Sequence, residues 1–346
     1  MTEHGTSAVT PYTGPAIFHL GHIKTASTFL QQRVFGVAGT GTGIPGGALT
    51  RRHLVGELVA CDPFAFDAAA LATRLEALEA PVRAQGLVPV WSDEVLIGDP
   101  CQRAYHGRAV ADRILAIGRP LRVLIVVREQ RSFAWSAYRQ YVSNGGVLAL
   151  SDFVGRPGLP VSHTPILRPD YLEFDGAIGF WRKAVGGENL LVLPYEMLRG
   201  DPAGFIAAIA GLIGVEAFSV DASESLNVGD HAATIGLRRL ANGVAPVSPL
   251  GDPPSRLRRA LLGVARRIGH WAPRPLHRQA ERKAKAMIAD TYGDRFAASN
   301  GRLAAMTGLD LARWGYPVAE ASRLDQPRTS TGSAPMVEGS STARTR

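Results

Sequence analysis

The sequence predicts an α/β fold in which a doubly wound parallel sheet is flanked by helices. Continuous apolar runs of strand length recur along the chain, which is typical of parallel strands covered on both faces. Helical segments alternate with these runs, and that alternation favours a parallel sheet. Substrates of such folds bind at the carboxyl ends of the strands, so we expect the functional site there.

The first predicted unit is a strand, a polar loop and a helix. Residues 16–20 form an apolar run that ends at Gly21, and residues 28–35 have a helical pattern. A second buried strand is expected at residues 87–91, although Pro89 interrupts it. This order places the polar loop at the carboxyl end of the first strand.

The clearest strand is predicted at residues 121–127, which end in the run Val-Leu-Ile-Val-Val. A helix follows over about residues 130–142, and a fourth strand is expected at residues 190–193. An apolar helix over residues 202–213 begins after an Asp-Pro pair that is typical of helix starts.

The composition excludes several classes of protein. The chain has 346 residues, of which 46% are hydrophobic and 20% charged, so it can form a sizeable core. Its 38 glycines and 23 prolines are too few for a low-complexity chain. Cys61 and Cys101 cannot form a disulfide framework, and no Cys/His cluster with ligand spacing predicts a zinc site.

No targeting or membrane-spanning segment is predicted. Residues 1–14 lack the basic start and apolar core of a secretory signal. The longest uncharged apolar stretch, residues 203–215, is shorter than the ~20 residues that a transmembrane helix needs. We therefore expect a cytoplasmic protein.

The net charge of +8 is concentrated in one segment. Ten of the residues from 255 to 287 are basic and only Glu281 is acidic. Within this segment, residues 256–268 have apolar side chains at helical spacing with arginines between them, which predicts a basic amphipathic helix that ends before Pro273. Such a helix either is a solvated surface or binds an acidic acceptor or an anionic membrane.

The loop after the first strand has the composition of an anion site. Residues 20–28 read LGHIKTAST and lead into the predicted helix. Backbone N–H groups and the positive end of the helix dipole favour a phosphate there, and Lys24, Ser27 and Thr28 add charge and donors. The loop is not an ATPase P-loop, because it has no Gly-Lys pair in the pattern G-x-x-x-x-G-K-[ST].

A second candidate anion site follows the third strand. Arg128 comes directly after residues 121–127, and Ser136 lies eight positions later on the next predicted helix. Both side chains can donate to the oxygens of one phosphate. Alone the pair is not specific, since an arginine at a strand end often forms only a solvated ion pair.

Together the two sites resemble those of sulfotransferases that use 3′-phosphoadenosine 5′-phosphosulfate. The family's 5′-phosphosulfate loop, K-x-G-T-T or K-T-x-S-T, is similar to KTAST at residues 24–28, although Ala26 stands where many members have glycine. Its 3′-phosphate motif, an arginine with a serine eight positions later, is similar to Arg128 and Ser136. Further segments are similar to those of bacterial carbohydrate-type members: LPYEML at 193–198 followed by Asp201-Pro202, SNGRL at 299–303 and WGYP at 314–317.

The resemblance covers about residues 15–317 and implies a single domain with a P-loop NTPase-like α/β fold. It implies an enzyme that moves a sulfuryl group from 3′-phosphoadenosine 5′-phosphosulfate to an acceptor hydroxyl, on a saccharide or glycoconjugate. We assign residues 15–325 to this sulfotransferase domain, residues 1–14 to a flexible N-terminus and residues 326–346 to a disordered tail. Neither a metal ion nor a nucleic acid is expected to take part.

The resemblance also implies roles for the residues of the two sites. Lys24 would be catalytic, stabilising charge on the bridging oxygen of the leaving phosphate. Arg128 and Ser136 would bind the 3′-phosphate. The expected cofactor-binding set is Lys24, Thr25, Ala26, Ser27, Thr28, Arg128 and Ser136.

The general base is expected to be Glu94, because it follows the second strand and opens onto the same edge of the sheet. The resemblance implies either a glutamate or a histidine in this role, so His22 and His53 are rival candidates. Alternatively, Glu94 only complements the dipole at a helix N-terminus. Loops at residues 36–60 and 145–170 are expected to shape the acceptor site.

Two other functions remain as alternatives. A P-loop nucleotide kinase or NTPase would use Asp93 at the end of the second strand as a magnesium ligand, but the loop lacks the Gly-Lys order. A non-catalytic protein that binds acidic polymers would use residues 256–285 and would have no need for Lys24 and Arg128.

Overall fold

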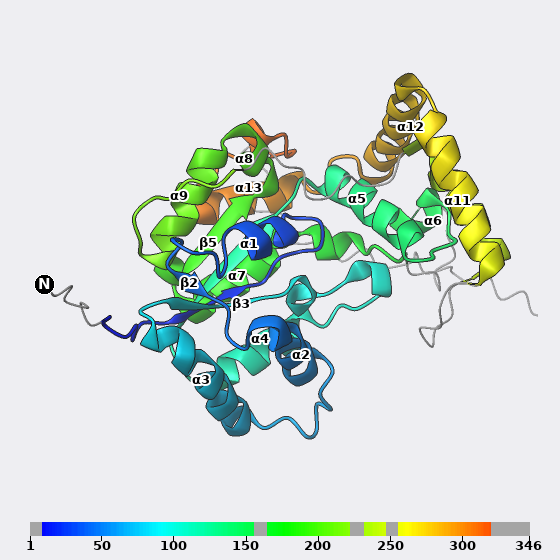
Figure 1. Ribbon diagram of the computed structural model, residues 1–346. Helices are drawn as coiled ribbons and strands as arrows, with labels where there is room; N and C mark the ends of the chain where they lie inside the picture. Colours follow the sequence, from blue (N-terminus) through cyan, green and yellow to red (C-terminus); the bar gives the residue numbers. More distant parts are fainter. Residues whose placement is uncertain (1–8, 156–164, 222–231, 247–254, 320–346) are drawn as a thin grey trace, which may run out of the picture.

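A five-stranded sheet forms the centre of the computed structural model, which describes residues 9–155, 165–221, 232–246 and 255–319. The paired strands are all parallel and follow the order β2-β3-β1-β4-β5 (Figure 1). The predicted parallel sheet is therefore confirmed. The strands are β1 (Ala16–His19), β2 (Thr42–Gly43), β3 (Val88–Ser92), β4 (Leu121–Val127) and β5 (Leu190–Pro194).

The side chains of β4 enter two separate cores, one on each face of the sheet. Val123 and Ile125 belong to one apolar cluster, and Leu124 and Val126 belong to the other. All four are fully buried, as the period of two along a strand requires when both faces are covered.

Helices cover both faces of the sheet, which is the doubly wound arrangement that the sequence predicts. The first face packs against α3 (Ala68–Ala84), α4 (Gly107–Ala116), α5 (Gln130–Ser143), α7 (Phe174–Val185) and α13 (Ala297–Thr307). The second face packs against α1 (Ser27–Arg33) and α9 (Pro202–Ile213). The central strand β1, the loop after it and α1 form a P-loop-like unit.

The predicted elements agree with the structure to within a few residues at their ends. β4 and α9 have the predicted bounds. β3 tolerates Pro89 because only the two-residue strand β2 lies beside it there. The expectation that residues 36–60 form a loop is wrong in part, because they contain β2 and the helix α2 (Thr50–Leu54). Residues 145–170 contain α6 (Leu150–Val154).

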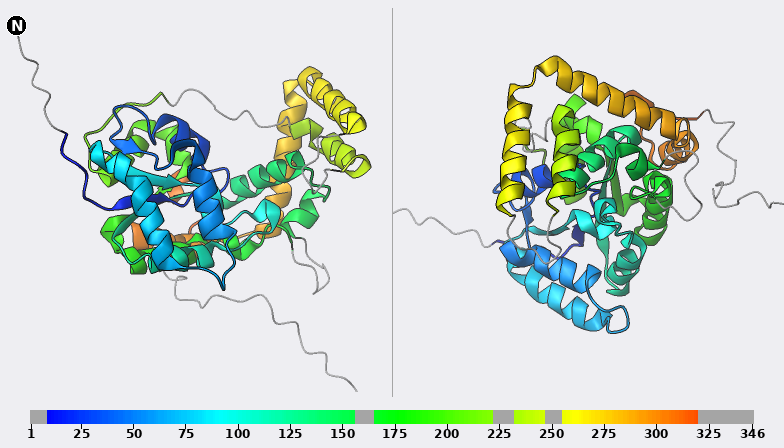
Figure 2. Two further views of the ribbon diagram at one scale, coloured as in Figure 1. Left: turned by 60° about the horizontal axis from the view of Figure 1, so that its bottom comes forward. Right: turned by 90° about the vertical axis from the view of Figure 1, so that its right-hand side faces the viewer.

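Three helices after α9 form an arm at one side of the sheet. They are α10 (Ile235–Val244), α11 (Arg256–Trp271) and α12 (Arg274–Tyr292). α10 and α11 lie side by side, and α12 packs against α5 and α6 (Figure 2). The predicted basic helix is α11, which extends three residues beyond the predicted end, and the predicted break before α12 is confirmed.

The ends of the chain are described only in part. The predicted tail at 326–346 and residues 1–8 lie outside the described residues. Nearer the sheet, the backbone N–H of Tyr12 donates to the carbonyl of Arg83 at 2.8 Å, and its hydroxyl donates to the carbonyl of Pro15 at 2.9 Å. Among the described helices, none combines the length and the apolar character that a bilayer crossing requires.

Candidate functional site

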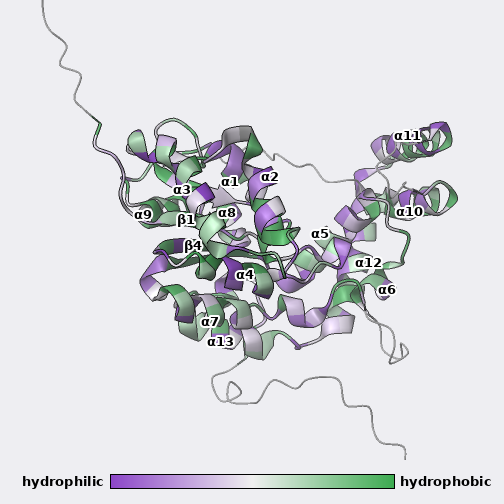
Figure 3. Ribbon diagram, turned by 90° about the horizontal axis from the view of Figure 1, so that it is seen from below, coloured by the Kyte–Doolittle hydropathy of each residue, from purple (hydrophilic) through white to green (hydrophobic). Residues whose placement is uncertain are grey.

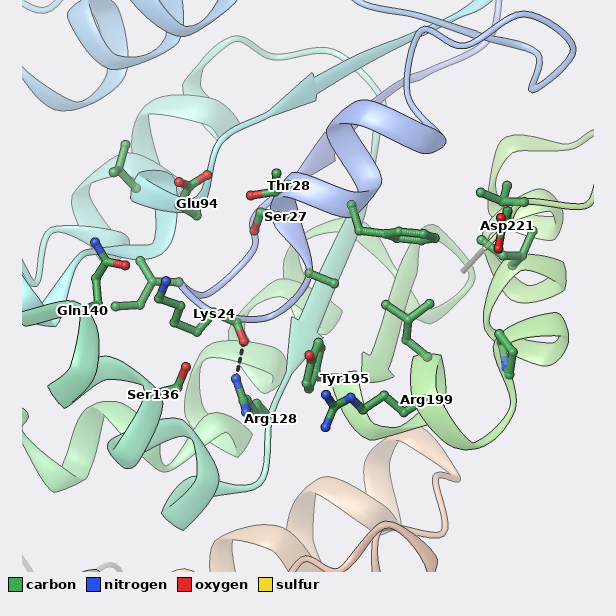
Figure 4. A pocket seen from close by; sticks show the side chains of 18 of the residues that line it. Lys24, Ser27, Thr28, Glu94, Arg128, Ser136, Gln140, Tyr195, Arg199 and Asp221 are labelled. Carbon is green, nitrogen blue, oxygen red and sulfur yellow. Dashed lines mark hydrogen bonds between the residues drawn. The ribbon is translucent and has the colours of Figure 1, made fainter. Parts of the chain in front are cut away.

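The carboxyl ends of four neighbouring strands meet at a cavity of about 1730 Å³. Glu94 follows β3, the loop that contains Lys24 follows β1, Arg128 follows β4, and Tyr195 follows β5. All four side chains line the cavity (Figure 4). The chain passes from β1 to β2 and β3 on one side of β1 and then crosses to β4 on its other side, and open α/β sheets bind ligands where the strand order reverses in this way.

The loop between β1 and α1 has an unusual backbone. Lys24 and Ala26 have φ values of 63° and 70°, in the left-handed region that residues with a Cβ rarely adopt. Between them, the buried hydroxyl of Thr25 donates to the carbonyl of His22 at 2.5 Å and holds the turn. Residues that alternate between left- and right-handed conformations direct successive N–H groups to one side, which makes an anion-binding concavity.

Ser27 gives the loop an unused donor. Its Oγ is buried and has no hydrogen-bond partner within the described residues. No side chain caps α1, whose N-cap residue is Ala26. A Cβ on Gly21 would lie 2.8 Å from Ser27 Oγ, so only glycine leaves this oxygen its space. The loop therefore fits a ligand that brings acceptor oxygens, such as a phosphate.

Positive charge gathers around this loop. Lys24, Arg128 and Arg139 all line the cavity, as do Arg51 and Arg199. Burial lowers the pKa of Lys24, and the charges of Arg139 and Arg128 lower it further. These five cations outnumber the three carboxylates of the lining, Glu94, Asp99 and Asp221, so this grouping favours an anionic ligand.

Arg128 is fixed next to the loop. One guanidinium NH₂ group donates to the carbonyl of Lys24 at 2.8 Å, and the guanidinium lies 4.6 Å from the ring centroid of Tyr195. Its Nε is buried without a partner in the described part of the chain. Ser136, on α5, lines the same cavity (Figure 4). The structure thus brings the Arg128 and Ser136 pair and the Lys24 loop to one cavity.

Glu94 opens the short 3₁₀ helix Glu94–Ile97 at the end of β3. The cap of this helix is Asp93, whose carboxylate accepts from the N–H of Val95 at 3.0 Å. Glu94 itself lines the cavity, and its charge acts on the pKa of Lys24 in the raising direction. Asp93 thus supplies the capping hydrogen bond, while Glu94 lies in the first turn of the helix, where a carboxylate also complements the helix dipole.

The two histidines considered as bases do not line the cavity. His22 is buried among the rings of Phe133, Tyr171 and Phe174, and its Nδ1 lies 3.0 Å from the Tyr171 hydroxyl. Burial lowers the pKa of His22 to about 3. His53 is half-buried on α2. This geometry favours Glu94 over both.

Several cavity residues were missed in the sequence. Tyr195 follows the fourth predicted strand, so it could have been placed at the carboxyl edge of the sheet by the same reasoning that placed Arg128 there. Arg139 and Gln140 follow Ser136 by three and four positions, so they share its side of α5. No described residue of 145–170 lines this cavity, and residues 156–164 lie outside the described part of the chain, so the expected role of this loop at the acceptor stays a prediction. Other lining residues are Asp99, Gln102, Asn144, Arg199, Phe218 and Asp221.

Replacing Ala26 by glycine is expected to stabilise the protein by about 0.5–1 kcal/mol, because a left-handed residue with a Cβ costs more than the added chain entropy of glycine. Urea unfolding measures the change. The matched control is Ala77→Gly at an exposed position inside α3, which should lower stability by about 1 kcal/mol. Equal losses in both variants would contradict the strain at Ala26.

The buried His22 predicts a pH dependence of stability. Its pKa is about 3 in the folded protein, so below about pH 6.5 the unfolded chain binds a proton that the folded chain does not. Stability should therefore fall with decreasing pH, with His22 contributing about 1.4 kcal/mol per pH unit. Urea unfolding between about pH 4 and 7 gives the unfolding free energy at each pH. For His22→Asn this free energy should change with pH less steeply than for the wild type, by the amount that His22 contributes. If the wild type and the variant have identical slopes, the His22 imidazole is charged or exposed in the folded protein.

The fold and the site define an α/β protein in which a P-loop-like loop at the end of β1 and the Arg128 and Ser136 pair after β4 line one cavity. In the described residues, no three His, Cys, Asp or Glu side chains are placed to hold a metal ion. No family model and no curated protein matches the chain.

Two solved structures with similar folds are sulfotransferases. One is a sulfotransferase from Alicyclobacillus acidocaldarius, with 16% identity, a TM-score of 0.47, and coverage of 88% of this chain and 99% of that one. The other is the sulfotransferase domain of the Synechococcus PCC 7002 olefin synthase, with 17% identity, a TM-score of 0.34, and coverage of 80% and 96%. Neither similarity assigns a function to this chain, so function is inferred from the residues of the cavity.

Proposed function

We propose that the protein is a sulfotransferase that uses 3′-phosphoadenosine 5′-phosphosulfate as the sulfuryl donor. One observation carries the proposal: the Lys24 loop and the Arg128 and Ser136 pair, about a hundred residues apart in sequence, line a single cavity. Two separate anion sites fit a ligand with two separate phosphate groups. The cytoplasmic location expected from the sequence is part of the same proposal.

Each of these cavity residues would have a separate role in the proposed reaction. When bound, the donor supplies the sulfuryl group that passes to the acceptor. The Lys24 ammonium would donate to the oxygen between sulfur and the 5′-phosphate as that bond breaks. Glu94 would take the proton of the acceptor hydroxyl as the hydroxyl oxygen bonds to sulfur. The Ser27 hydroxyl and the loop N–H groups would hold the 5′-phosphate, and Arg128 and Ser136 the 3′-phosphate.

The part of the cavity beside Glu94 supports a polar acceptor. Glu94, Lys24 and Gln140 all line the cavity (Figure 4). Gln102, Asn144 and Asp99 add side-chain donors and acceptors to the lining. Amide and carboxylate groups of this kind match the hydroxyls of a saccharide, which is the acceptor class that we propose.

A kinase or NTPase is less well supported by the geometry. Asp93, the candidate magnesium ligand, already accepts from the N–H of Val95 and pairs with Arg51 at 3.3 Å. The loop also lacks the Gly-Lys pair that a magnesium nucleotide requires.

Isothermal titration separates the candidate functions. The purified chain should bind 3′-phosphoadenosine 5′-phosphate, and ATP with Mg²⁺ should bind at least about 100-fold more weakly, because it leaves the second anion site empty. The reverse order would support a kinase or NTPase. Binding of heparin without binding of either nucleotide would support the non-catalytic alternative.

Replacing Arg128 by alanine tests the second anion site. The variant should bind 3′-phosphoadenosine 5′-phosphate about 10- to 100-fold more weakly, as expected for the loss of a charged hydrogen-bond donor. Adenosine 5′-phosphosulfate, which lacks the 3′-phosphate, should lose much less. Titration of both ligands measures the difference, and Arg131→Ala is the control, since Arg131 pairs with Glu129 outside the cavity. Equal losses for the two ligands would place Arg128 at another part of the ligand.

A further inference from the structure

α11 exposes a stripe of apolar side chains. Leu257, Val264, Ile268 and Trp271 are exposed by 54%, 51%, 49% and 83%. They are separated by seven, four and three positions, so they share one side of the helix. A tryptophan that is mostly exposed at the end of such a stripe is unusual for a helix that only faces water.

A different side of α11 holds the helix to the protein. Arg258, Ala265 and Gly269 are buried, and the guanidinium of Arg258 donates to the carbonyl of Ala245 after α10 at 2.8 Å. The apolar stripe is therefore not the face that packs against the neighbouring helices.

α10 extends the apolar surface. Leu240 and Val244 are exposed by 64% and 59%, on the helix that lies beside α11 (Figure 3). Of the fourteen exposed large apolar side chains in the described residues, eight lie between residues 240 and 287. We call the six that belong to these two helices the arm surface: Leu240, Val244, Leu257, Val264, Ile268 and Trp271.

Apart from His270 on α11, all acidic and basic side chains of α10 and α11 are arginines. α10 has two, Arg238 and Arg239, and neither helix contains Asp or Glu. α11 has five: Arg256, Arg258, Arg259, Arg266 and Arg267. An apolar stripe flanked only by positive charge requires a partner that is both apolar and anionic.

We propose that the arm surface binds an anionic phospholipid membrane, with the apolar stripe at the headgroup boundary and the exposed arginines of α11, Arg256, Arg259, Arg266 and Arg267, among the headgroups. A tryptophan favours this boundary because its ring is apolar and its N–H is polar. Paired copies of α11 would place arginines against arginines. Residues 320–346 contain four arginines and three acidic residues, so this segment does not supply the complementary charge.

The arm is joined to the cavity through α5. The side-chain amide of Asn242, on α10, donates to the carbonyls of Val142 and Gly146 at the end of α5 at 2.8 and 2.9 Å. α5 carries Ser136, Arg139 and Gln140 of the cavity lining. Membrane binding would therefore hold the cavity near the bilayer surface, whatever reaction takes place in it.

Vesicle flotation of the full-length chain tests the proposal. The protein should float with vesicles of phosphatidylcholine and phosphatidylglycerol, less so at high salt, and should not float with phosphatidylcholine alone. The double variant Ile268→Ser/Trp271→Ser should bind the anionic vesicles at least about tenfold more weakly. The control is Phe64→Ser, which removes an aromatic ring that is 99% exposed and lies outside the arm, and should bind as the wild type does. Circular dichroism checks that each variant is folded.

Three outcomes would overturn the proposal. The wild type would fail to float with anionic vesicles, or would float equally with neutral ones. The double variant, folded, would float as well as the wild type. Sedimentation would show a dimer that the double variant dissociates, which would identify a second copy of the chain as the partner of the arm surface.

Discussion

Replacing Lys24 by alanine is expected to lower the rate of sulfuryl transfer by about 10³-fold while leaving the fold intact. Lys24 lines the cavity together with Arg128 and Ser136, and its ammonium would stabilise charge on the leaving phosphate. No ion pair in the described residues uses its side chain, so the fold does not depend on it. Alanine also tolerates the left-handed backbone at this position, as Ala26 does two residues later.

Single-turnover kinetics with a saturating donor measure the chemical step, and thermal unfolding measures the fold. Lys183→Ala is the matched control, because Lys183 is exposed on α7 and lies outside the cavity lining. Turnover of Lys24→Ala within about tenfold of the wild type would exclude the proposed catalytic role.

The sequence predicted most of the sheet because its strands are buried on both faces. In residues 121–127 every residue except Arg122 is apolar, so the strand character of the run is clear and the bounds of β4 follow directly. Arg128, directly after β4, and Glu94, two residues after β3, could then be placed at one edge. In a parallel sheet all carboxyl ends lie at the same edge, so residues that follow different strands come close together.

Other parts of the site could not be predicted in this way. β2 has only two residues, which show no periodicity. Residues 217–221 line the cavity although they belong to no helix or strand, and no local pattern indicates where such a segment lies. The left-handed backbone of Ala26 was equally hidden, because alanine predicts a helix rather than a left-handed residue.

For the same reason, the sequence could not show that the His22 side chain lies outside the cavity. A histidine in a polar loop next to a candidate catalytic lysine is a reasonable base from sequence. In the structure, the loop turns its side chain inward, against Phe133 and Phe174. The direction of a side chain in a tight loop depends on the backbone conformation, which residue types alone do not determine.

Replacing Glu94 by glutamine is expected to lower turnover by about 10² to 10⁴-fold. Glutamine keeps the shape and the hydrogen-bonding capacity of the side chain but cannot take the proton of the acceptor. The affinity for 3′-phosphoadenosine 5′-phosphate should hardly change, because Glu94 contributes no donor to either anion site. Titration with this ligand and steady-state kinetics with a saccharide acceptor measure the two quantities on the same preparation.

The capping hydrogen bond of Asp93 makes this test sharper than the sequence alone allowed. Since Asp93 already caps the 3₁₀ helix, Glu94→Gln should change the unfolding free energy by less than about 1 kcal/mol. If Glu94→Gln has normal turnover and lower stability, Glu94 acts only as a carboxylate at the helix N-terminus and is not the general base. His22→Asn and His53→Asn complete the comparison: both side chains lie outside the cavity lining, so neither should reduce turnover by more than a few-fold at neutral pH. A large loss in one of them, with unchanged affinity for the bisphosphate, would identify that histidine as the base instead.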